Sequence, residues 1–158
     1  MKRNSTNSRI SVFVLRSFSL LTIIFLAASG FSHRTPVPGA PGIEFFTGTW
    51  KQAVEKAQKE NKPIFMDVYA KWCGPCKLLK KNTFTNKNVA VFYNKNFINI
   101  SFDAEKGEGA EIATQLGVTA FPTLFYFNKN GKPVLYSLGY HEPGQLIEAG
   151  KAALKNIQ

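Results

Sequence analysis

Residues 72–77 read Trp72-Cys73-Gly74-Pro75-Cys76-Lys77 and contain the only two cysteines among 158 residues. The apolar run at residues 63–69 precedes this segment and predicts a strand, and residues 77–82 predict a helix. Only two residues separate the cysteines, so their sulfurs can interconvert between a dithiol and a disulfide. The sequence therefore places a candidate redox centre where a strand passes into a helix.

A cysteine at the first turn of a helix has a reactive sulfur. If Cys73 is the N-cap, Pro75 falls in the first turn, where it loses no helical hydrogen bond. The Cys73 sulfur can then accept a hydrogen bond from the Cys76 N–H, as a capping serine does. The positive end of the helix favours the thiolate over the thiol. Cys73 is thus the predicted nucleophile, and Cys76 is the thiol that resolves the mixed disulfide.

The cysteine pair could also serve three purposes that involve no redox catalysis. A zinc site would need two further ligands, and the only histidines, His33 and His141, do not stand at a recognised spacing. A structural disulfide between Cys73 and Cys76 would close a very short loop and stabilise the chain little. The domain could also serve only as a binding module.

The block at residues 72–77, with Asp67 six residues before its first cysteine, resembles the active site of thioredoxin. The resemblance covers residues 43–158. It implies thiol–disulfide exchange through Cys73 and Cys76, with no metal and no organic cofactor.

Two further segments match the same family. Phe121-Pro122-Thr123 falls where thioredoxins carry a cis-proline, which would expose the Phe121 backbone to pair with a substrate peptide; an ordinary trans proline at the start of a strand is the alternative. Gly139 matches the family's glycine turn and would allow close backbone approach, unless it is a bulge glycine. The resemblance thus implies six substrate-binding residues: Trp72, Gly74, Pro75, Phe121, Pro122 and Gly139.

Asp67 lies inside an apolar run and is costly to bury. In the family this position lies beneath the second cysteine and accepts its proton; an aspartate on a solvated face of the sheet is the alternative. Thioredoxins pair the acid with a lysine on the neighbouring strand, but here the corresponding place is close to Asn99, and residues 97–102 contain no lysine. We therefore expect Asp67 to be harder to ionise.

Residues 67–73 and 81–89 resemble one branch of the family, the C-terminal periplasmic domain of the disulfide reductase DsbD and small secreted relatives. This resemblance implies protein thiol or disulfide substrates and a membrane-borne electron donor. Two cysteines and no others also suit an exported protein whose disulfide is catalytic.

The N-terminal segment is typical of an export signal. Residues 1–16 are basic and contain no acid, residues 18–28 are apolar, and small residues follow up to Gly30. We predict a signal peptide over residues 1–30; an uncleaved membrane anchor through residues 10–28 is the alternative, and a core helix is a third. A Pro/Gly-rich linker at 31–42 and a folded domain at 43–158 follow.

The basic charge of the chain is partly a property of this segment. The formal net charge is +10, from 20 Lys and Arg against 10 Asp and Glu. Four of the basic residues precede residue 31, which leaves 16 against 10, or +6, in a cleaved chain. This excess is mild and shows no aromatic-interleaved basic stripe, so we predict no nucleic-acid partner. We expect a monomer.

The periodicity predicts an α/β domain. Expected strands lie at 43–46, 63–69, 97–102, 123–127 and 133–138, and expected helices at 50–60, 77–82, 89–93, 110–116 and 146–154. Helical crossovers join parallel strands, and the terminal hairpin adds an antiparallel strand. The result is a mixed central sheet with helices on both faces, which is also the thioredoxin fold that the resemblance implies.

The sequence thus predicts an exported thiol–disulfide oxidoreductase that reduces proteins outside the cytoplasm. Gly74-Pro75 is the dipeptide of reducing thioredoxins, no histidine lies between the cysteines, and the nearby Lys71 and Lys77 are expected to be solvated. A disulfide-forming oxidase is the alternative direction.

Overall fold

The computed structural model describes residues 42–157. The predicted signal or anchor segment at residues 1–30, the tether at 10–28 and nearly all of the predicted linker at 31–42 lie outside these residues and stay predictions. No helix within 42–157 has both the length and the hydropathy that a membrane span requires.

A four-stranded mixed sheet forms the centre of the domain, in the order β2-β1-β3-β4. The strands are β1 (Ile64–Tyr69), β2 (Ile98–Asp103), β3 (Thr123–Phe127) and β4 (Pro133–Leu138). Strand β1 pairs parallel with β2 and antiparallel with β3, and β3 and β4 form the terminal hairpin. The helices are α1 (Trp50–Glu60), α2 (Gly74–Leu78), the π-helical turn η1 (Leu79–Thr83), α3 (Lys87–Asn96), α4 (Glu108–Gln115) and α5 (Pro143–Ile157).

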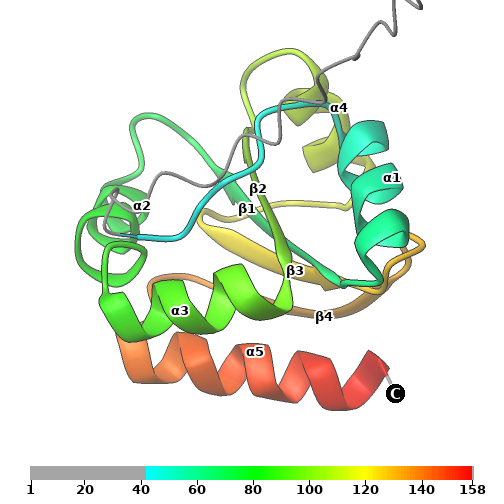
Figure 1. Cartoon of the computed structure of the whole chain (residues 1–158). Helices are drawn as coiled ribbons and strands as arrows, with labels where there is room; N and C mark the ends of the chain where they lie inside the picture. Colours follow the sequence, from blue (N-terminus) through cyan, green and yellow to red (C-terminus); the bar gives the residue numbers. More distant parts are fainter. Residues whose placement is uncertain (1–41, 158) are drawn as a thin grey trace, which may run out of the picture. The chain divides into compact units, whose positions relative to one another are not determined.

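Helices cover both faces of the sheet, as predicted (Figure 1). Alternate side chains of a strand point to opposite faces, so Phe65 and Met66 belong to different cores. Phe65 packs with residues of η1, α3 and α5, whereas Met66 packs with residues of α1 and α4. Figure 1 shows α3 and α5 lying side by side along one face. Asp67 and Tyr69 share the face of Phe65, the face on which η1 packs.

Helix α1 begins and ends as its sequence predicts. The Thr49 hydroxyl accepts a hydrogen bond from the Gln52 N–H at 3.2 Å, and the Gln52 side chain accepts one from the Thr49 N–H, which forms a capping box. Asn61 ends the helix in the left-handed conformation with φ 52°. Ala53 and Ala57 are buried against the sheet.

The predicted first strand at residues 43–46 is wrong. Only one isolated parallel bridge forms there, between Phe45 and Asn99. The Ile43 N–H donates to the Phe84 carbonyl oxygen instead of to a strand. Part of the segment's backbone is thus bonded to the turn between η1 and α3, so only Phe45 pairs with the edge strand β2.

The break predicted after the redox helix is confirmed. Helix α2 continues into η1, where hydrogen bonds span five residues instead of four. The Phe84 N–H, for example, donates to the Leu79 carbonyl oxygen at 2.9 Å. The Asn86 side chain then caps α3 by accepting hydrogen bonds from the Asn88 and Val89 N–H groups. Leu79 is fully buried, so η1 is anchored on the face of the sheet that carries Asp67.

Candidate active site

The Cys73–Cys76 pair lies where the loop after β1 enters α2. Cys73 is the N-cap with φ −67° and ψ 113°, and its Sγ accepts a hydrogen bond from the Cys76 N–H at 3.1 Å. Pro75 falls in the first turn, where no helical hydrogen bond is lost. The two sulfurs form a disulfide with an S–S distance of 2.06 Å. The predicted capping of the helix by Cys73 is confirmed.

Exposed residues surround the two buried cysteines. Cys73 and Cys76 are 3% and 2% exposed, whereas the preceding Trp72 is 68% exposed. The Trp72 ring meets Phe121 edge to face at 5.8 Å between centroids, and its Nε1 donates to the Glu105 carboxylate at 2.9 Å. Gly74 and Pro75 are exposed as well. An apolar surface beside the disulfide is therefore open to a protein substrate.

The structure brings Phe121, Pro122 and Gly139 together, with Phe121 beside the cysteines. The Phe121–Pro122 peptide bond is cis, as the resemblance implied. The Phe121 side chain packs against the small cluster that contains Cys73 and Cys76. The Pro122 carbonyl oxygen accepts a hydrogen bond from the Gly139 N–H at 2.8 Å. Phe121 thus lies against the redox pair, and Pro122 and Gly139 are joined to it through the chain and this hydrogen bond.

Gly139 is required for its backbone conformation. Its φ is 82°, a left-handed value that favours glycine. A Cβ built at this position would meet no atom of the described residues within 4 Å, so no neighbouring segment of the domain requires a glycine here, and close approach of a substrate backbone stays a prediction.

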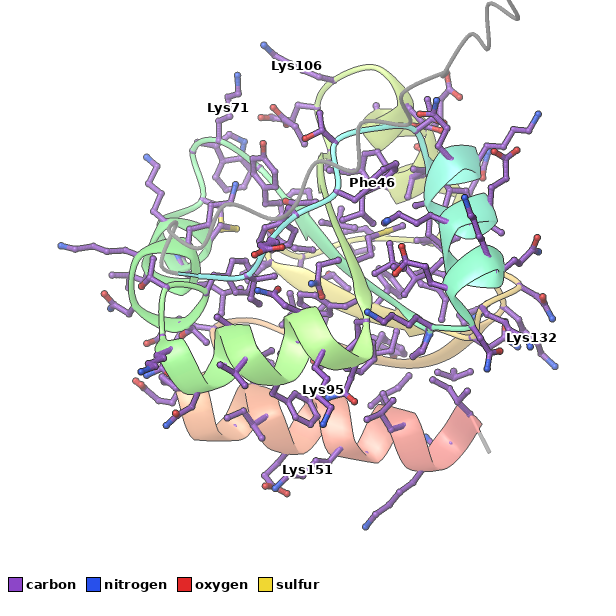
Figure 2. All side chains as sticks on the ribbon, in the orientation of Figure 1. Phe46, Lys71, Lys95, Lys106, Lys132 and Lys151 are labelled. Atoms are coloured by element: carbon purple, nitrogen blue, oxygen red, sulfur yellow. A yellow bond between two sulfur atoms is a disulfide. The ribbon has the colours of Figure 1, made fainter. Side chains whose placement is uncertain are left out.

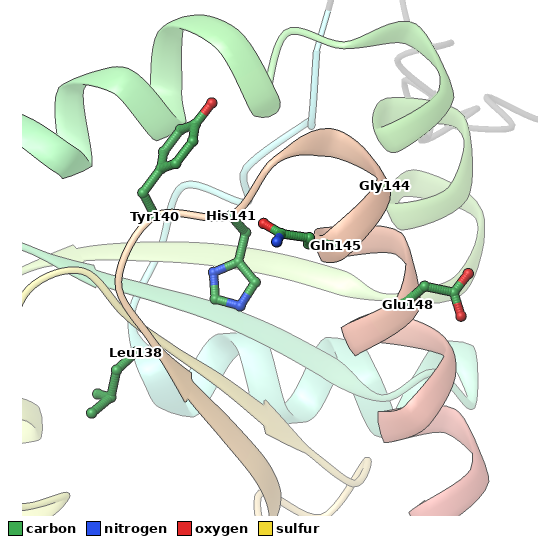
Figure 3. Close-up of a pocket in the computed structure, with 6 residues that line it drawn as sticks. All are labelled: Leu138, Tyr140, His141, Gly144, Gln145 and Glu148. Atoms are coloured by element: carbon green, nitrogen blue, oxygen red, sulfur yellow. The ribbon is translucent and has the colours of Figure 1, made fainter.

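An open hollow of about 580 Å³ lies next to Gly139 (Figure 3). Its lining residues come from the end of β4, the loop that follows and the start of α5: Leu138, Tyr140, His141, Gly144, Gln145 and Glu148. The His141 Nδ1 lies 3.0 Å from the Gly139 carbonyl oxygen, which fixes the loop close to the site.

Asp67 is a buried acid. It is 1% exposed, and its Oδ2 accepts a hydrogen bond from the Ser101 hydroxyl at 2.8 Å. Burial raises the pKa of Asp67 to about 6, although the Ser101 hydrogen bond and the charge of Lys80 both lower it. This environment agrees with the expectation that Asp67 is harder to ionise. The alternative, an aspartate on a solvated face of the sheet, does not agree with it.

The neighbour of Asp67 on β2 is Ser101, and the expected position close to Asn99 is wrong. The register pairs Asp67 with Ser101 and Phe65 with Asn99. The Asn99 amide instead donates to the Glu44 carbonyl oxygen at 3.3 Å, toward the N-terminal segment. A hydroxyl, rather than an amide, therefore lies beside the acid.

Lys80 is a residue of this region that the sequence reasoning missed. Its Nζ lies 3.1 Å from the centroid of the Tyr69 ring, in a cation–π contact. Burial lowers the pKa of Lys80, and the negative charges of Asp67 and Asp103 oppose that effect. The only sequence signal was its spacing four residues after Cys76, which places both on the same side of the helix.

The lysine that precedes the motif lies further from the chemistry. Lys71 is exposed, and its Nζ is 3.9 Å from the Asp103 Oδ2. Figure 2 shows Lys71 and Lys106 projecting away from the domain. Such charges are screened by solvent and contribute little. Within the described part of the chain, no group of three or more His, Cys, Asp or Glu side chains could hold a metal ion.

The chain is similar to known proteins in sequence and fold. The model of the thioredoxin-like domain family matches residues 50–154. Thioredoxin of Echinococcus granulosus is 37% identical over 101 residues, which cover 61% of this chain and 86% of that protein.

Two solved structures are also similar. A candidate disulphide-isomerase from Bacteroides thetaiotaomicron matches with a TM-score of 0.66 and 37% identity, over 74% of this chain and 97% of that one. The oxidised C-terminal domain of Neisseria meningitidis DsbD matches with a TM-score of 0.57 and 25% identity, over 71% of this chain and 99% of that one.

The family match covers more than half of the chain and includes both cysteines, which lie at the start of α2 as a disulfide. The chain belongs to the thioredoxin-like family and is a thiol–disulfide oxidoreductase.

Proposed function

We propose that this protein is exported and reduces disulfides of proteins outside the cytoplasm, with Cys73 as nucleophile, Cys76 as resolving thiol and Asp67 as proton acceptor. The single observation that carries the proposal is the position of Cys73 at the N-cap of α2, with its Sγ bonded to the Cys76 N–H. That N–H and the helix dipole stabilise a thiolate at Cys73. The electrons are carried by the two sulfurs, so the exchange needs no metal or organic cofactor.

In the first step, the Cys73 thiolate attacks one sulfur of the substrate disulfide. A bond forms between Cys73 and that sulfur, the substrate S–S bond breaks, and the other substrate sulfur leaves as a thiolate that takes a proton from solvent. The exposed Trp72, Gly74 and Pro75 offer a contact surface. Phe121 packs beside the two cysteines, where the resemblance to thioredoxin implies that its backbone pairs with the substrate chain.

In the second step, the Cys76 thiol gives its proton to the Asp67 carboxylate, and its sulfur attacks Cys73. The mixed disulfide breaks, the second substrate sulfur leaves as a thiolate, and the protein holds the Cys73–Cys76 disulfide. Two electrons have then passed from the protein to the substrate. Asp67 is suited to this role because burial brings its pKa to about 6, close to neutral pH.

Location outside the cytoplasm is supported by the signal-like residues 1–30 and by the similarity to a DsbD C-terminal domain. An exported domain cannot reach cytosolic reductants, so we propose a membrane-borne dithiol as electron donor. The client would be an oxidised extracytoplasmic protein.

An insulin reduction assay with dithiothreitol as donor tests the activity. The purified protein should accelerate precipitation of the insulin B chain, and Cys73→Ser should remove the acceleration. A wild type no faster than the variant would leave the domain with a binding role only.

The direction of exchange is tested by the midpoint potential. Pro75 provides no N–H to the Cys73 sulfur, and neither residue between the cysteines carries a charge, so the thiolate is stabilised only moderately. We expect a potential nearer the roughly −270 mV of thioredoxin than the roughly −120 mV of DsbA. Equilibration in glutathione buffers, read by Trp72 fluorescence, measures it. A value at the oxidising end would make the protein a disulfide-forming enzyme.

The location is tested by fusing a reporter that is active only in the periplasm after Gln158. An active fusion is expected, and fractionation then separates a cleaved chain from one anchored through residues 10–28. Recovery of the full-length chain from the cytosol would contradict both forms of export.

A further inference from the structure

Asp67 is held in the protein with only part of its hydrogen-bonding capacity used. Its Oδ2 accepts the Ser101 hydroxyl hydrogen at 2.8 Å, whereas its Oδ1 is buried without a hydrogen-bond partner among residues 42–157. A carboxylate in such a place is strongly disfavoured unless a positive charge lies near it. The strand beside it supplies Ser101, which carries no charge.

Lys80 brings a positive charge to this place from η1, the turn that continues α2. Its Nζ lies 3.1 Å from the centre of the Tyr69 ring. Tyr69 follows Asp67 by two residues on β1, so both side chains lie on the same face of the sheet. The Tyr69 ring therefore holds the ammonium group between η1 and the face that carries Asp67. The Lys80 residue as a whole remains exposed, which gives the ammonium group access to solvent as well.

The other charged groups of the region do not replace Lys80. Lys71 faces the Asp103 carboxylate at 3.9 Å, and Asp103 adds a further negative charge on β2. Lys106 acts on Tyr69, where burial has the largest effect and raises the pKa of the phenol. Among the described residues, Lys80 is the cation whose charge acts on Asp67, and it opposes the effect of burial.

We propose that Lys80, held on the Tyr69 ring, is a positioning residue that sets how tightly Asp67 holds its proton and thereby the pH range of the second exchange step. The proposal rests on the proposed role of Asp67 as proton acceptor for Cys76. Removing the Lys80 charge leaves only the Ser101 hydrogen bond to oppose the effect of burial, so Asp67 keeps its proton to higher pH and a smaller fraction of it is ionised and able to accept a proton near pH 6.

The electrostatic part is tested by titrating the Asp67 carboxyl carbon by NMR in the full-length protein. For Lys80→Met, the titration midpoint should move to higher pH by about half to one unit, as expected for the loss of one partly screened charge. Lys80→Arg should keep the wild-type midpoint. Lys81→Met is the matched control, because it removes the next charge along η1 without touching Tyr69. An unmoved midpoint in Lys80→Met, or an equal shift in the control, would overturn the proposal.

The kinetic part is tested by the pH dependence of insulin reduction. With a midpoint raised by about half to one unit from about 6, Lys80→Met should be about two- to fivefold slower than wild type at pH 6 and nearly equal at pH 8. A merely structural defect would slow both pH values alike. If the NMR midpoint moves and the rate profile does not, Lys80 does not set the pH range of exchange and Asp67 is not the proton acceptor. If insulin is not reduced at any pH, the proposed activity fails while the NMR result still decides the electrostatic part.

Discussion

Replacing Asp67 with asparagine should stabilise the folded protein at pH 8 far more than at pH 4. Burial raises the pKa of Asp67 from its ordinary 3.8 to about 6 in the folded state. A group with a raised folded-state pKa contributes stability that is fully present below its unfolded pKa and is lost as the pH rises through its folded pKa. Above about pH 6, the wild type therefore holds a buried carboxylate that the variant does not.

The size of the effect follows from the two pKa values. Their difference is about two pH units, and each unit corresponds to about 1.4 kcal/mol, so ionisation costs the wild type about 3 kcal/mol at pH 8. At pH 4, the cost is only about 0.5 kcal/mol. Folded Asp67 is then almost fully protonated, and Asp67 in the unfolded chain is about half protonated. The free-energy difference between Asp67→Asn and wild type should thus grow by about 2 to 3 kcal/mol from pH 4 to pH 8.

Urea unfolding of both proteins in the disulfide form at the two pH values measures this difference. Comparing the two pH values removes any fixed cost of the amide beside Ser101, since that cost does not titrate. The groups that titrate elsewhere are shared by both proteins and cancel. A difference that stays constant between pH 4 and pH 8, or that shrinks, would refute the assignment of Asp67 as a buried acid with a raised pKa.

Two further substitutions test neighbouring contacts. Ser101→Ala removes the hydrogen bond that favours the charged form of Asp67, so the Asp67 carboxyl titration followed by NMR should move to higher pH; an unchanged titration would mean that this bond does not reach the carboxylate in solution. Gly109→Ala should lower the free energy of unfolding by roughly 1 to 3 kcal/mol, because the new Cβ would lie 2.2 Å from the Asp103 carbonyl oxygen and the backbone must shift. Thermal unfolding measures it, and a wild-type melting temperature would show that α4 is not seated so closely on β2.

Local chemistry made much of the fold predictable. Helix α1 is bounded by Thr49 and Asn61, whose capping roles follow from their own side chains, and its observed ends match the prediction. The Cys73 cap could be anticipated because Pro75 tolerates only the first turn of a helix. In both cases, the signal lies within a few residues of the structure that it determines.

The errors concern contacts between distant segments. Residues 43–46 have the composition of a strand, but the distant Phe84 carbonyl oxygen takes the Ile43 N–H, and only Phe45 pairs with β2. The sequence predicts a partner for Asp67 close to Asn99, because nothing local reports the register that brings Ser101 beside it. Lys80 reaches Tyr69 through the packing of η1 on the sheet, and its spacing from Cys76 gives its side of the helix but does not report that contact.

Trapping of mixed disulfides tests the exchange mechanism most directly, because it reads the roles of the two sulfurs separately. In Cys76→Ser, the resolving thiol is absent, so substrate proteins should stay bound to Cys73 and be recovered as covalent complexes that dithiothreitol releases. In Cys73→Ser, the remaining thiol is Cys76, which lies within α2 rather than at its N-cap and so lacks the hydrogen bond that favours a thiolate at Cys73, and few complexes should form. Equal trapping by the two variants, or trapping mainly through Cys76, would contradict the mechanism.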